Sequence, residues 1–449
     1  MKNKVRKNSV AFAGGAFGDE GKGRIVDEYV SQFVKKGPVM VYRDNGGANA
    51  GHTVELGGKR LALHQLPSGV FVKGARVVLG KNMVLHPADL IRELNQAKEM
   101  GMKATVAIDE LAVLCLDTHR AYEAVLKGWN EGGKAATGRG ISPAYADVLL
   151  RHPLRMRDLV EFDEKKFISH YKLYQALIKG LGKNLAEVEV PALGQKKNVK
   201  VGSFKEFFAR LKQERRELVP LVDDVYDLLK KAWNDKRYAF VFEKAQAIGL
   251  DTRWGVYPDI TASDTTFDGI FSSTDGLIDP QEIEHRVMVL KATYMSSVGT
   301  RILPAVMNEK LANKIREDAN EYGATTGRPR GVVHFDVPAI RFFADVSKAN
   351  GCVLTHMDIV YPDTPIKICV GYTLKGKPVP YRPDQVYLSK VKPVYRELAP
   401  WSKEKIQAAR TKRALPQQAK TFLTFIEKEL GIPVIAITTG PGRSQGITL

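Results

Sequence analysis

Apolar and polar residues follow one another along the chain in a pattern that predicts strands alternating with helices. Residues 8–17 form a short apolar run that ends in glycines, and residues 19–36 then carry apolar side chains at helical spacing. A second apolar run, residues 38–47, also ends in a glycine turn. Residues 75–101 predict a strand, a loop and a helix that opens at Pro87.

Further strands are predicted at residues 103–115 and 432–445, whereas residues 156–240 form the most helical and most charged stretch. Strands that end in glycine loops are typical of a parallel sheet that binds ligands at its carboxyl ends. We therefore predict an α/β fold with a large, mostly parallel central sheet flanked by helices, a helix-rich lobe and smaller subdomains. No linker rich in Pro, Ser or Gly divides the chain, so residues 1–449 are expected to form a single domain.

Composition and cysteine usage narrow the class of protein. A chain of 449 residues with 44% hydrophobic content is long enough to bury a large core. The three cysteines, Cys115, Cys352 and Cys369, are scattered through apolar runs, which indicates reduced thiols rather than a disulfide framework. The apolar residues 10–17 end in charged residues rather than a cleavage site, and no stretch is long enough to span a membrane. We expect a soluble, cytoplasmic protein with no membrane partner.

The formal net charge of +18 raises the question of a nucleic-acid partner. Lysines and arginines are spread over the whole length, and no basic stripe with interleaved aromatic residues is present. Excess positive charge also steers small anionic substrates toward a cleft. We therefore expect small anionic ligands and no nucleic-acid partner.

The loop after the first predicted strand resembles a phosphate-binding loop but departs from the usual pattern G-x-x-x-x-G-K-[ST]. Ala16 stands where the first glycine is expected, and Gly23 replaces the hydroxyl residue after Lys22. Asp19 and Glu20 place two acids inside a loop that is built to bind anions. Glu20 fits the role of a helix N-terminal acid. Asp19 has no such explanation, and its presence therefore indicates chemistry beyond anion binding.

Three more stretches carry residues suited to anions. Residues 42–54 combine glycine pairs, asparagines and a histidine, His52, which favour tight turns and close approach of the backbone to a ligand. Residues 136–147 contain a Thr-Gly-Arg-Gly turn able to hold a phosphate through backbone N–H groups and Arg139. Residues 324–331 repeat this chemistry with two arginines and two hydroxyl groups. Four such loops in one chain predict a site for several anionic groups.

In these motifs the chain resembles the adenylosuccinate synthetase family. The resemblance runs from GDEGKGRIVD through NAGHTV, HQLPSGV, TGRGISPAY, YPDITASDTT, ATTGRPRG and THMDIV to ITTGPGR, and it is weak only in residues 156–240. It implies a relative of the P-loop GTPases that joins L-aspartate to inosinate (IMP) at the expense of GTP. The reaction would pass through 6-phosphoryl-IMP and yield adenylosuccinate, GDP and phosphate. A homodimer is also implied.

The resemblance assigns chemical roles to the acid and base residues of the loops. Asp19 would take the N1 proton of IMP and, with the backbone carbonyl of Gly51, bind Mg²⁺, a hard cation that prefers oxygen ligands. His52 would stabilise the phosphate that leaves GTP. Lys22 would hold the γ-phosphate, and Gln246 completes the catalytic set. The acids are therefore explained by proton transfer and metal binding within a phosphate site.

The resemblance also assigns the binding positions. The expected IMP contacts are Asp19, Asn49, Thr137, Arg151, Gln246, Thr261 and Arg328, of which Arg151 would reach the nucleotide of the neighbouring subunit. The expected GTP contacts are Gly18, Glu20, Gly21, Lys22, Gly23, Gly51, His52, Thr53, Arg330, His356, Asp358, Thr438 and Gly440. The expected aspartate contacts are Ala324, Thr325, Thr326, Arg328 and Arg330. Within the GTP set, Asp358 would accept hydrogen bonds from N1 and N2 of guanine and so select the donor base.

Four departures from the family pattern bear on substrate preference. In residues 243–247 the chain has EKAQA where the family usually has EGAQG, so Lys244 and Ala247 replace glycines. His356 stands in place of a lysine, and Asp264 in place of an asparagine. Thr438 replaces a serine, which is a minor chemical change.

Three functional interpretations stay open at this point. The first is the family's own reaction. The second is a related synthetase that aminates another purine nucleotide such as (d)GMP, in which the resemblance implies loss of the carboxylate at Asp19. The third is a basic nucleotide- or RNA-binding protein without ligase activity. The acid at Asp19 favours the first over the second, and its combination with Lys22, His52 and Arg328 argues against an inactive site.

Overall fold

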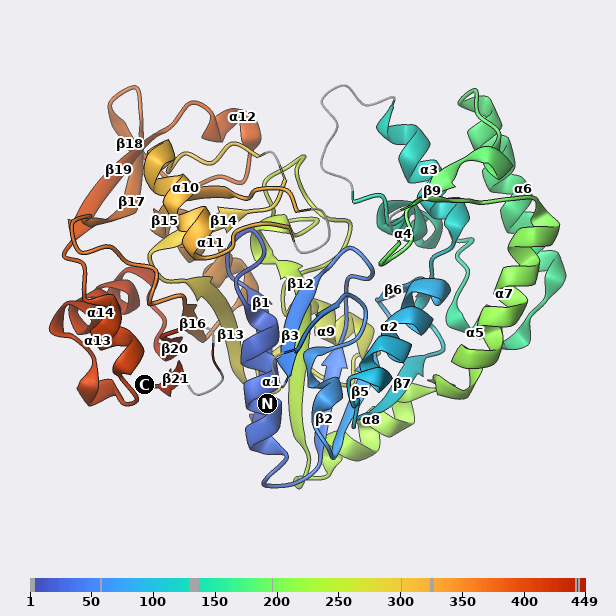
Figure 1. The fold of residues 1–449 in the computed structure, drawn as a ribbon, viewed down its shortest axis with the longest axis horizontal. Helices are drawn as coiled ribbons and strands as arrows, with labels where there is room; N and C mark the ends of the chain where they lie inside the picture. Colours follow the sequence, from blue (N-terminus) through green and yellow to red (C-terminus); the bar gives the residue numbers. More distant parts are fainter. Residues whose placement is uncertain are drawn as a thin grey trace. The chain divides into compact units, whose positions relative to one another are not determined.

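The computed structural model forms two compact units, each built from separate segments of the chain (Figure 1). The first contains Met1–Glu28, Gln246–Asp268 and Pro280–Leu449, and the second contains Tyr29–Ala245 and Gly269–Asp279. The structure describes residues 5–56, 59–128, 137–195, 197–299, 301–323, 327–440, 442 and 445–449. The predicted single domain remains a prediction.

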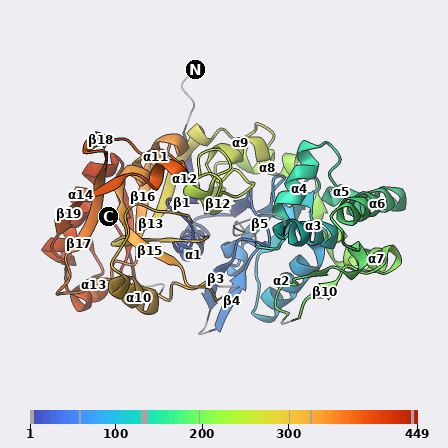
Figure 2. The same cartoon turned by 90° about the horizontal axis from the view of Figure 1, so that it is seen from above.

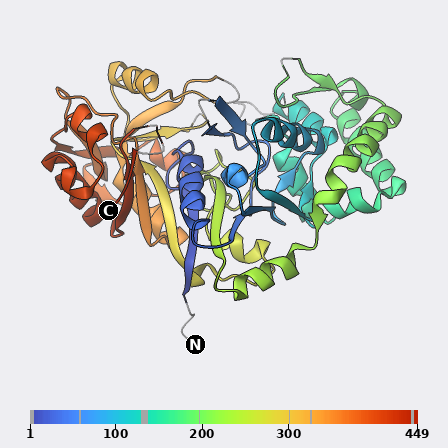
Figure 3. The same cartoon turned by 60° about the horizontal axis from the view of Figure 1, so that its bottom comes forward.

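The first unit is built on parallel strands. Their order is β1 (Arg6–Gly14), β13 (Ile283–Lys291), β16 (Gly351–Thr355) and β20 (Val434–Thr438), with β21 (Gly446–Thr448) antiparallel at the end. The strands β13 and β16 run side by side in Figure 3. The helices of this unit include α10 (Glu309–Asp318), α11 (Val337–Ser347), α12 (Gln385–Leu388), α13 (Lys403–Ala408) and α14 (Gln417–Leu430), whereas α9 (Asp268–Ser273) belongs to the second unit except for Asp268. A smaller sheet contains β14 (Tyr294–Ser297), β15 (Gly331–Asp336), β17 (Ile366–Leu374), β18 (Lys377–Val379) and β19 (Lys392–Leu398).

The second unit repeats the parallel arrangement. Its order is β11 (Val222–Asp223), β7 (Thr105–Asp109), β5 (Ala75–Leu79), β2 (Val39–Arg43) and β12 (Ala239–Ala247), all parallel. Two short ladders accompany it, β3 (His52–Leu56) with β4 (Lys59–Leu63) and β6 (Val84–Leu85) with β8 (Val113–Leu114). Its first helices are α2 (Pro87–Glu99), α3 (Asp117–Lys127) and α4 (Ile141–Leu149). Mostly parallel strands flanked by helices confirm the predicted α/β class.

The described part of residues 156–240 contains four α-helices and little strand. The helices are α5 (Met156–Glu161), α6 (Glu164–Gly180), α7 (Phe204–Leu218) and α8 (Val225–Asn234), and the strands β9 (Glu189–Val190) and β10 (Val199–Lys200) pair with each other. Figure 2 shows α5, α6 and α7 gathered at one end of this unit. The helices α6 and α7 pack against each other through aromatic pairs such as Tyr171 with Phe207.

Local sequence explains where the elements begin. All five residues of β2 are buried, as the continuous apolar run predicts for a strand covered on both faces. The helix α2 starts at Pro87 because proline fixes a helical φ and lacks the N–H that would be unsatisfied there. The helix α1 (Lys22–Phe33) begins later than the predicted residue 19, because Gly18, Asp19 and Gly21 have φ values of 101°, 61° and 85°.

Two predictions about the whole chain can be compared with the structure. The three cysteines are buried and unpaired, as expected for core thiols. No helix within the described residues is long and apolar enough to cross a membrane.

Candidate functional site

The loop between β1 and α1, residues 15–21, is positioned by a fully buried strand end. Val10 to Ala13 have no exposed surface, and Gly15 continues the strand by donating from its N–H to the carbonyl of Val289 at 2.8 Å. The left-handed residues Gly18 and Gly21 then turn the chain so that α1 begins with its free N–H groups at the loop. This arrangement suits an anion.

Glu20 folds back onto this loop and is only 1% exposed. Its Oε1 accepts from the N–H groups of Ala16 at 3.3 Å and Gly18 at 2.7 Å, and its Oε2 accepts from Lys22 Nζ at 3.1 Å. No acid lies in the first turn of α1, so Glu20 is not the helix N-terminal acid that the sequence suggested. It is a buried carboxylate that fixes the shape of the loop.

Asp19, one residue earlier, has the opposite environment. Its side chain is 33% exposed, and its Oδ2 accepts from Arg330 Nε at 2.6 Å. The structure therefore brings together two residues of the predicted site. Asp19 is expected to act as the general base, and Arg330 is expected to contact phosphate and aspartate. Because Arg330 is 311 residues away in sequence, this contact is a feature of the fold.

The predicted guanine contacts lie where β16 and β20 end. The N–H of His356 donates to Thr438 Oγ1 at 3.2 Å, and the N–H of Met357 donates to the Thr438 carbonyl at 3.0 Å. Burial, assisted by the nearby Lys291 ammonium, lowers the pKa of His356 to about 4. His356 is therefore neutral at pH 7, and any contact with a base would be stacking rather than a charge interaction.

Two residues that the sequence analysis did not single out support the same region. Gln407 Nε2 donates to Asp358 Oδ2 at 3.3 Å and so orients the carboxylate. Arg24, in the first turns of α1, donates to the carbonyls of Gly440 and Gly442. No sequence motif identifies these contacts, because each partner comes from a distant segment of the chain.

In the second unit, the loop between β2 and β3, residues 44–51, carries Asn49 and Gly51 and leads into His52. His52 Nε2 lies 3.6 Å from Glu243 Oε1. Glu243 is held by Ser68, whose N–H donates at 2.8 Å and whose hydroxyl donates at 3.0 Å. Glu243 and Ser68 are thus supporting residues for the predicted catalytic histidine.

Two side-chain amides among the predicted IMP contacts have unsatisfied buried atoms. Asn49 Oδ1 and Gln246 Nε2 are buried and lack a hydrogen-bond partner within the part of the chain that the structure describes. The other end of the Gln246 amide is fixed, because Ser263 Oγ donates to its Oε1 at 3.0 Å. Buried polar atoms without partners are rare in native proteins and commonly await a ligand or water.

The Thr-Gly-Arg-Gly turn agrees with the sequence interpretation only in part. Gly138 and Gly140 adopt left-handed φ values of 72° and 73°, and Thr137 is exposed. Arg139 is turned inward, where it is 7% exposed and donates to the carbonyl of Pro191 at 3.2 Å. The expectation that Arg139 holds a phosphate is therefore wrong for this arrangement, since its guanidinium is used inside the fold.

The remaining predicted residues are placed as follows. Arg151 is exposed and has a left-handed φ of 66°, just after α4 and beside the exposed Leu149 and Leu150. Thr261 donates from its N–H to the carbonyl of Leu250 at 2.7 Å. Ala324, Thr325 and Thr326 lie outside the described residues, as does the side chain of Thr53.

A buried group in α3, α4 and α6 has residue types that bind metals, but its hydrogen bonds favour another role. His119 Nε2 and His170 Nδ1 lie 3.0 and 4.0 Å from Asp147 Oδ2. The N–H of Leu116 donates to His119 Nδ1 at 2.9 Å, so the proton of the neutral ring lies on Nε2 and points toward Asp147. A metal would need that Nε2 lone pair. The group is therefore a hydrogen-bonded network, to which Tyr174 adds a bond at 2.9 Å.

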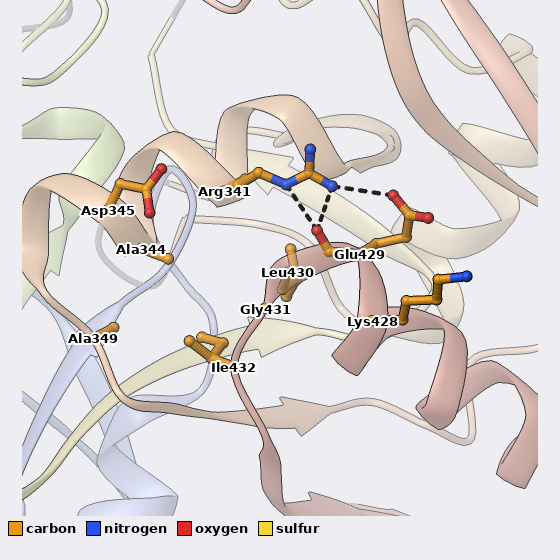
Figure 4. A pocket seen from close by; sticks show the side chains of 9 residues that line it. All are labelled: Arg341, Ala344, Asp345, Ala349, Lys428, Glu429, Leu430, Gly431 and Ile432. Atoms are coloured by element: carbon orange, nitrogen blue, oxygen red, sulfur yellow. Dashed lines mark hydrogen bonds and ion pairs between the residues drawn. The ribbon is translucent and has the colours of Figure 1, made fainter.

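A cavity of about 330 Å³ in the first unit lies between the ends of α11 and α14 (Figure 4). Arg341 crosses its rim and donates to the carbonyl of Glu429 at 2.8 Å. None of its nine lining residues belongs to the predicted site. This cavity is not a candidate for the substrate site.

A parallel α/β sheet with a glycine-rich, lysine-bearing loop at a helix N-terminus defines a nucleotide-binding α/β protein. The family model of adenylosuccinate synthetase matches residues 11–447, and the chain belongs to this family of ligases. It is 35% identical over 441 residues to the adenylosuccinate synthetase of Caldicellulosiruptor bescii. The aligned region covers 97% of this chain and 98% of that protein. It is 34% identical to that of Lactobacillus acidophilus, with 98% of both chains covered.

Solved structures similar to the chain include the following two. The fully ligated adenylosuccinate synthetase from Plasmodium falciparum has a TM-score of 0.85 and 27% identity, covering 98% of this chain and 100% of that one. The succinoaminodeoxyadenylate synthetase of cyanophage S-2L, bound to dGMP and dATP, has a TM-score of 0.60 and 16% identity, covering 99% and 96%. At that identity the second similarity shows the fold alone.

Proposed function

We propose that this protein is a GTP-dependent ligase that forms a C–N bond between L-aspartate and IMP to give adenylosuccinate, GDP and phosphate. The observation that carries the proposal is that Asn49 Oδ1 and Gln246 Nε2, both predicted to contact IMP, are buried and have no hydrogen-bond partner among the residues that the structure describes. A purine nucleotide offers the donors and acceptors that these amides lack. Membership of the adenylosuccinate synthetase family supports the same substrates.

The chemistry assigned to the loop at residues 15–21 follows from the different environments of its two acids. The oxygen of a purine 6-keto group is a poor leaving group, and phosphorylating it makes displacement by an amine feasible. Asp19, with an exposed carboxylate, is the group that would accept the N1 proton and make O6 nucleophilic. Lys22 and the N–H groups at the start of α1 would hold the phosphate, since phosphoryl transfer depends mainly on positioning and charge neutralisation.

Mg²⁺ is part of this proposal. An exposed carboxylate such as that of Asp19 fits a hard cation, and the resemblance adds the backbone carbonyl of Gly51 as a ligand. The ion would offset the negative charge of the phosphates. His52 would stabilise the leaving phosphate, and Arg328 and Arg330 suit the two carboxylates of aspartate because guanidinium groups bind them through paired hydrogen bonds.

The proposal includes a cytoplasmic homodimer in which Arg151 reaches the nucleotide of the partner subunit. In its support, Arg151 is exposed next to the large apolar side chains of Leu149 and Leu150, which are 83% and 66% exposed. Arg151→Leu should leave a folded dimer that binds IMP poorly. Mixing it with Asp19→Asn subunits should restore part of the activity, because one hybrid site would contain both intact residues. No restoration after verified subunit exchange would place the action of Arg151 within its own chain.

A steady-state assay with IMP, L-aspartate and GTP, following product absorbance, tests the proposal. Turnover with IMP supports it, and turnover only when GMP or dGMP replaces IMP would establish the related reaction instead. Absence of turnover with either nucleotide, together with tight, salt-sensitive RNA binding, would favour a binding protein. The family match and the carboxylate at Asp19 support the first outcome.

A further inference from the structure

Lys244 lies in β12 and forms an ion pair with Asp44, the first residue of the loop at residues 44–51. Both side chains have 0% exposure. Bringing two charges out of water costs free energy that their attraction seldom exceeds by much. A pair of this kind is therefore better explained by the arrangement that it specifies than by the stability that it adds.

The residues on either side of Lys244 hold the same loop. The N–H of Ala245 donates to Asn45 Oδ1 at 2.8 Å, and Asn45 Nδ2 donates to the Ala245 carbonyl at 3.4 Å. Glu243 lies against His52, at the far end of the loop. Three consecutive residues of β12 thus contact the two ends of one loop.

The loop needs such support because of its own composition. Gly46 and Gly47 are adjacent, and glycine loses more conformational freedom on ordering than any other residue. The backbone is also tightly packed, because a Cβ at Gly47 would lie 2.1 Å from the carbonyl oxygen of Val84. The glycines allow this approach but do not enforce it, so contacts from outside the loop, among them the bond from the Val84 N–H to the Gly46 carbonyl at 2.8 Å, favour the observed arrangement.

We propose that Lys244 is a positioning residue that orders the loop at residues 44–51 before substrate binds. Its ammonium holds Asp44, and the loop then presents Asn49 and His52 in their working arrangement. The role of those two residues rests on the proposed function, whereas the ordering of the loop does not. An enzyme whose loop is ordered only part of the time binds substrate more weakly by that fraction.

Lys244→Met keeps the length of the side chain and removes its charge. With the loop ordered about a tenth of the time, the KM values for IMP and GTP should rise about tenfold, with kcat within about threefold of wild type at saturation. In the free protein, amide hydrogen exchange of residues 44–52 should become faster, while exchange in β5 and β7 should not change. This second measurement needs no turnover and so tests the inference even if the proposed reaction is wrong.

The double variant Lys244→Met with Asp44→Asn separates positioning from stability. It removes both charges of the buried pair, so its Tm should recover from that of the single variant, while the KM values stay high and amide exchange in the loop stays fast. Recovery of KM and exchange together with Tm would overturn the proposal.

Leu229→Ala is the matched control, because Leu229 is 1% exposed in α8 of the same unit and its loss creates a cavity. It should lower Tm without changing KM or the exchange of residues 44–52. If Lys244→Met behaves in the same way, Lys244 has only a structural role.

Discussion

The loops at residues 15–21 and 44–51 are alike in sequence and differ in what holds them. Each follows a buried parallel strand, contains glycines and includes a buried acid. In the first, Glu20 bonds to Ala16, Gly18 and Lys22, all within four residues. In the second, Asp44 pairs with Lys244, 200 residues away. The buried acid of the first loop is therefore held by neighbouring residues, whereas the buried acid of the second loop is held by a distant strand.

The comparison also separates the two acids of the first loop. Glu20 is buried and already satisfied by backbone N–H groups, whereas Asp19 is one-third exposed and faces Arg330. A carboxylate that must take a proton from a substrate has to be accessible to it. The structure therefore distinguishes a chemical role for Asp19 from a structural role for Glu20, and the variants below test that distinction.

The largest effect is expected from Asp19→Asn. Loss of a general base commonly lowers the rate about 10²- to 10⁴-fold, and more when a metal is misplaced. Asparagine keeps the shape of the side chain but cannot take the N1 proton. Steady-state kinetics should show a drastic fall in kcat, with IMP and GTP binding within about tenfold of wild type, as for an interaction made chiefly in the transition state.

His52→Asn provides the companion measurement from the second loop. It should lower kcat in the same way, and the double variant should be little worse than either single variant because both residues serve one step. Near-normal turnover in Asp19→Asn would mean that the loop at residues 15–21 binds phosphate and that the Asp19 carboxylate takes no part in catalysis.

The next largest effect concerns Asp358, a third buried acid, which follows β16. If its oxygens accept from N1 and N2 of guanine, Asp358→Asn should reduce the preference for GTP over other donors by about 2–4 kcal/mol, or roughly 30- to 1000-fold. Competition kinetics with GTP, ITP and ATP measure this preference. An unchanged preference for GTP would refute the assignment, and Gln407 would then orient a carboxylate with no role in base selection.

Glu20→Gln should have an intermediate effect. The loss of an acid that only favours a helix N-terminus would have a mild effect. The structure instead shows a carboxylate that accepts from two backbone N–H groups and from the Lys22 ammonium. Glutamine replaces one acceptor oxygen with an NH₂ group. This donor would then face another donor, either a backbone N–H or the Lys22 ammonium, and the hydrogen bond would be lost. Losing such a bond costs about 1.5–3 kcal/mol, so the Kd for GTP should rise roughly 10- to 150-fold by calorimetry. An unchanged Kd would show that the loop keeps its shape without this acid.

The sequence was a good guide wherever structure depends on neighbouring residues. The continuous apolar run of β2, the start of α2 at Pro87 and the parallel α/β class all follow from local patterns. The beginning of α1 was predicted three residues early, because periodicity does not register the left-handed backbone at Asp19. The inward turn of Arg139 was missed since a Thr-Gly-Arg-Gly run looks the same whichever way the arginine points.

Contacts between distant segments could not be predicted in the same way. Residues 243–247 were noticed because Lys244 departs from the family pattern, yet nothing in the sequence indicates that Asp44 is its partner. The pairs of Asp19 with Arg330 and of Gln407 with Asp358 are of the same kind. Arg330 directly precedes β15 of the smaller sheet and Gln407 lies in α13, so such contacts depend on how separate elements pack, which local sequence patterns do not specify.

The smallest expected effect is that of Ser68→Ala, which tests how far the second loop depends on supports outside itself. The variant removes the 3.0 Å hydroxyl bond to Glu243 Oε1 but keeps the 2.8 Å bond from the Ser68 N–H to Oε2. The net loss of one hydrogen bond is about 1 kcal/mol, so kcat should fall roughly fivefold through a less well oriented Glu243 and His52. Ser272→Ala, which removes an exposed hydroxyl that accepts from Asn82, is the matched control and should leave kcat unchanged. Equal kcat values for the two variants would show that Glu243 is held without the hydroxyl, and the support of this loop by β12 would then rest on Lys244 and Ala245.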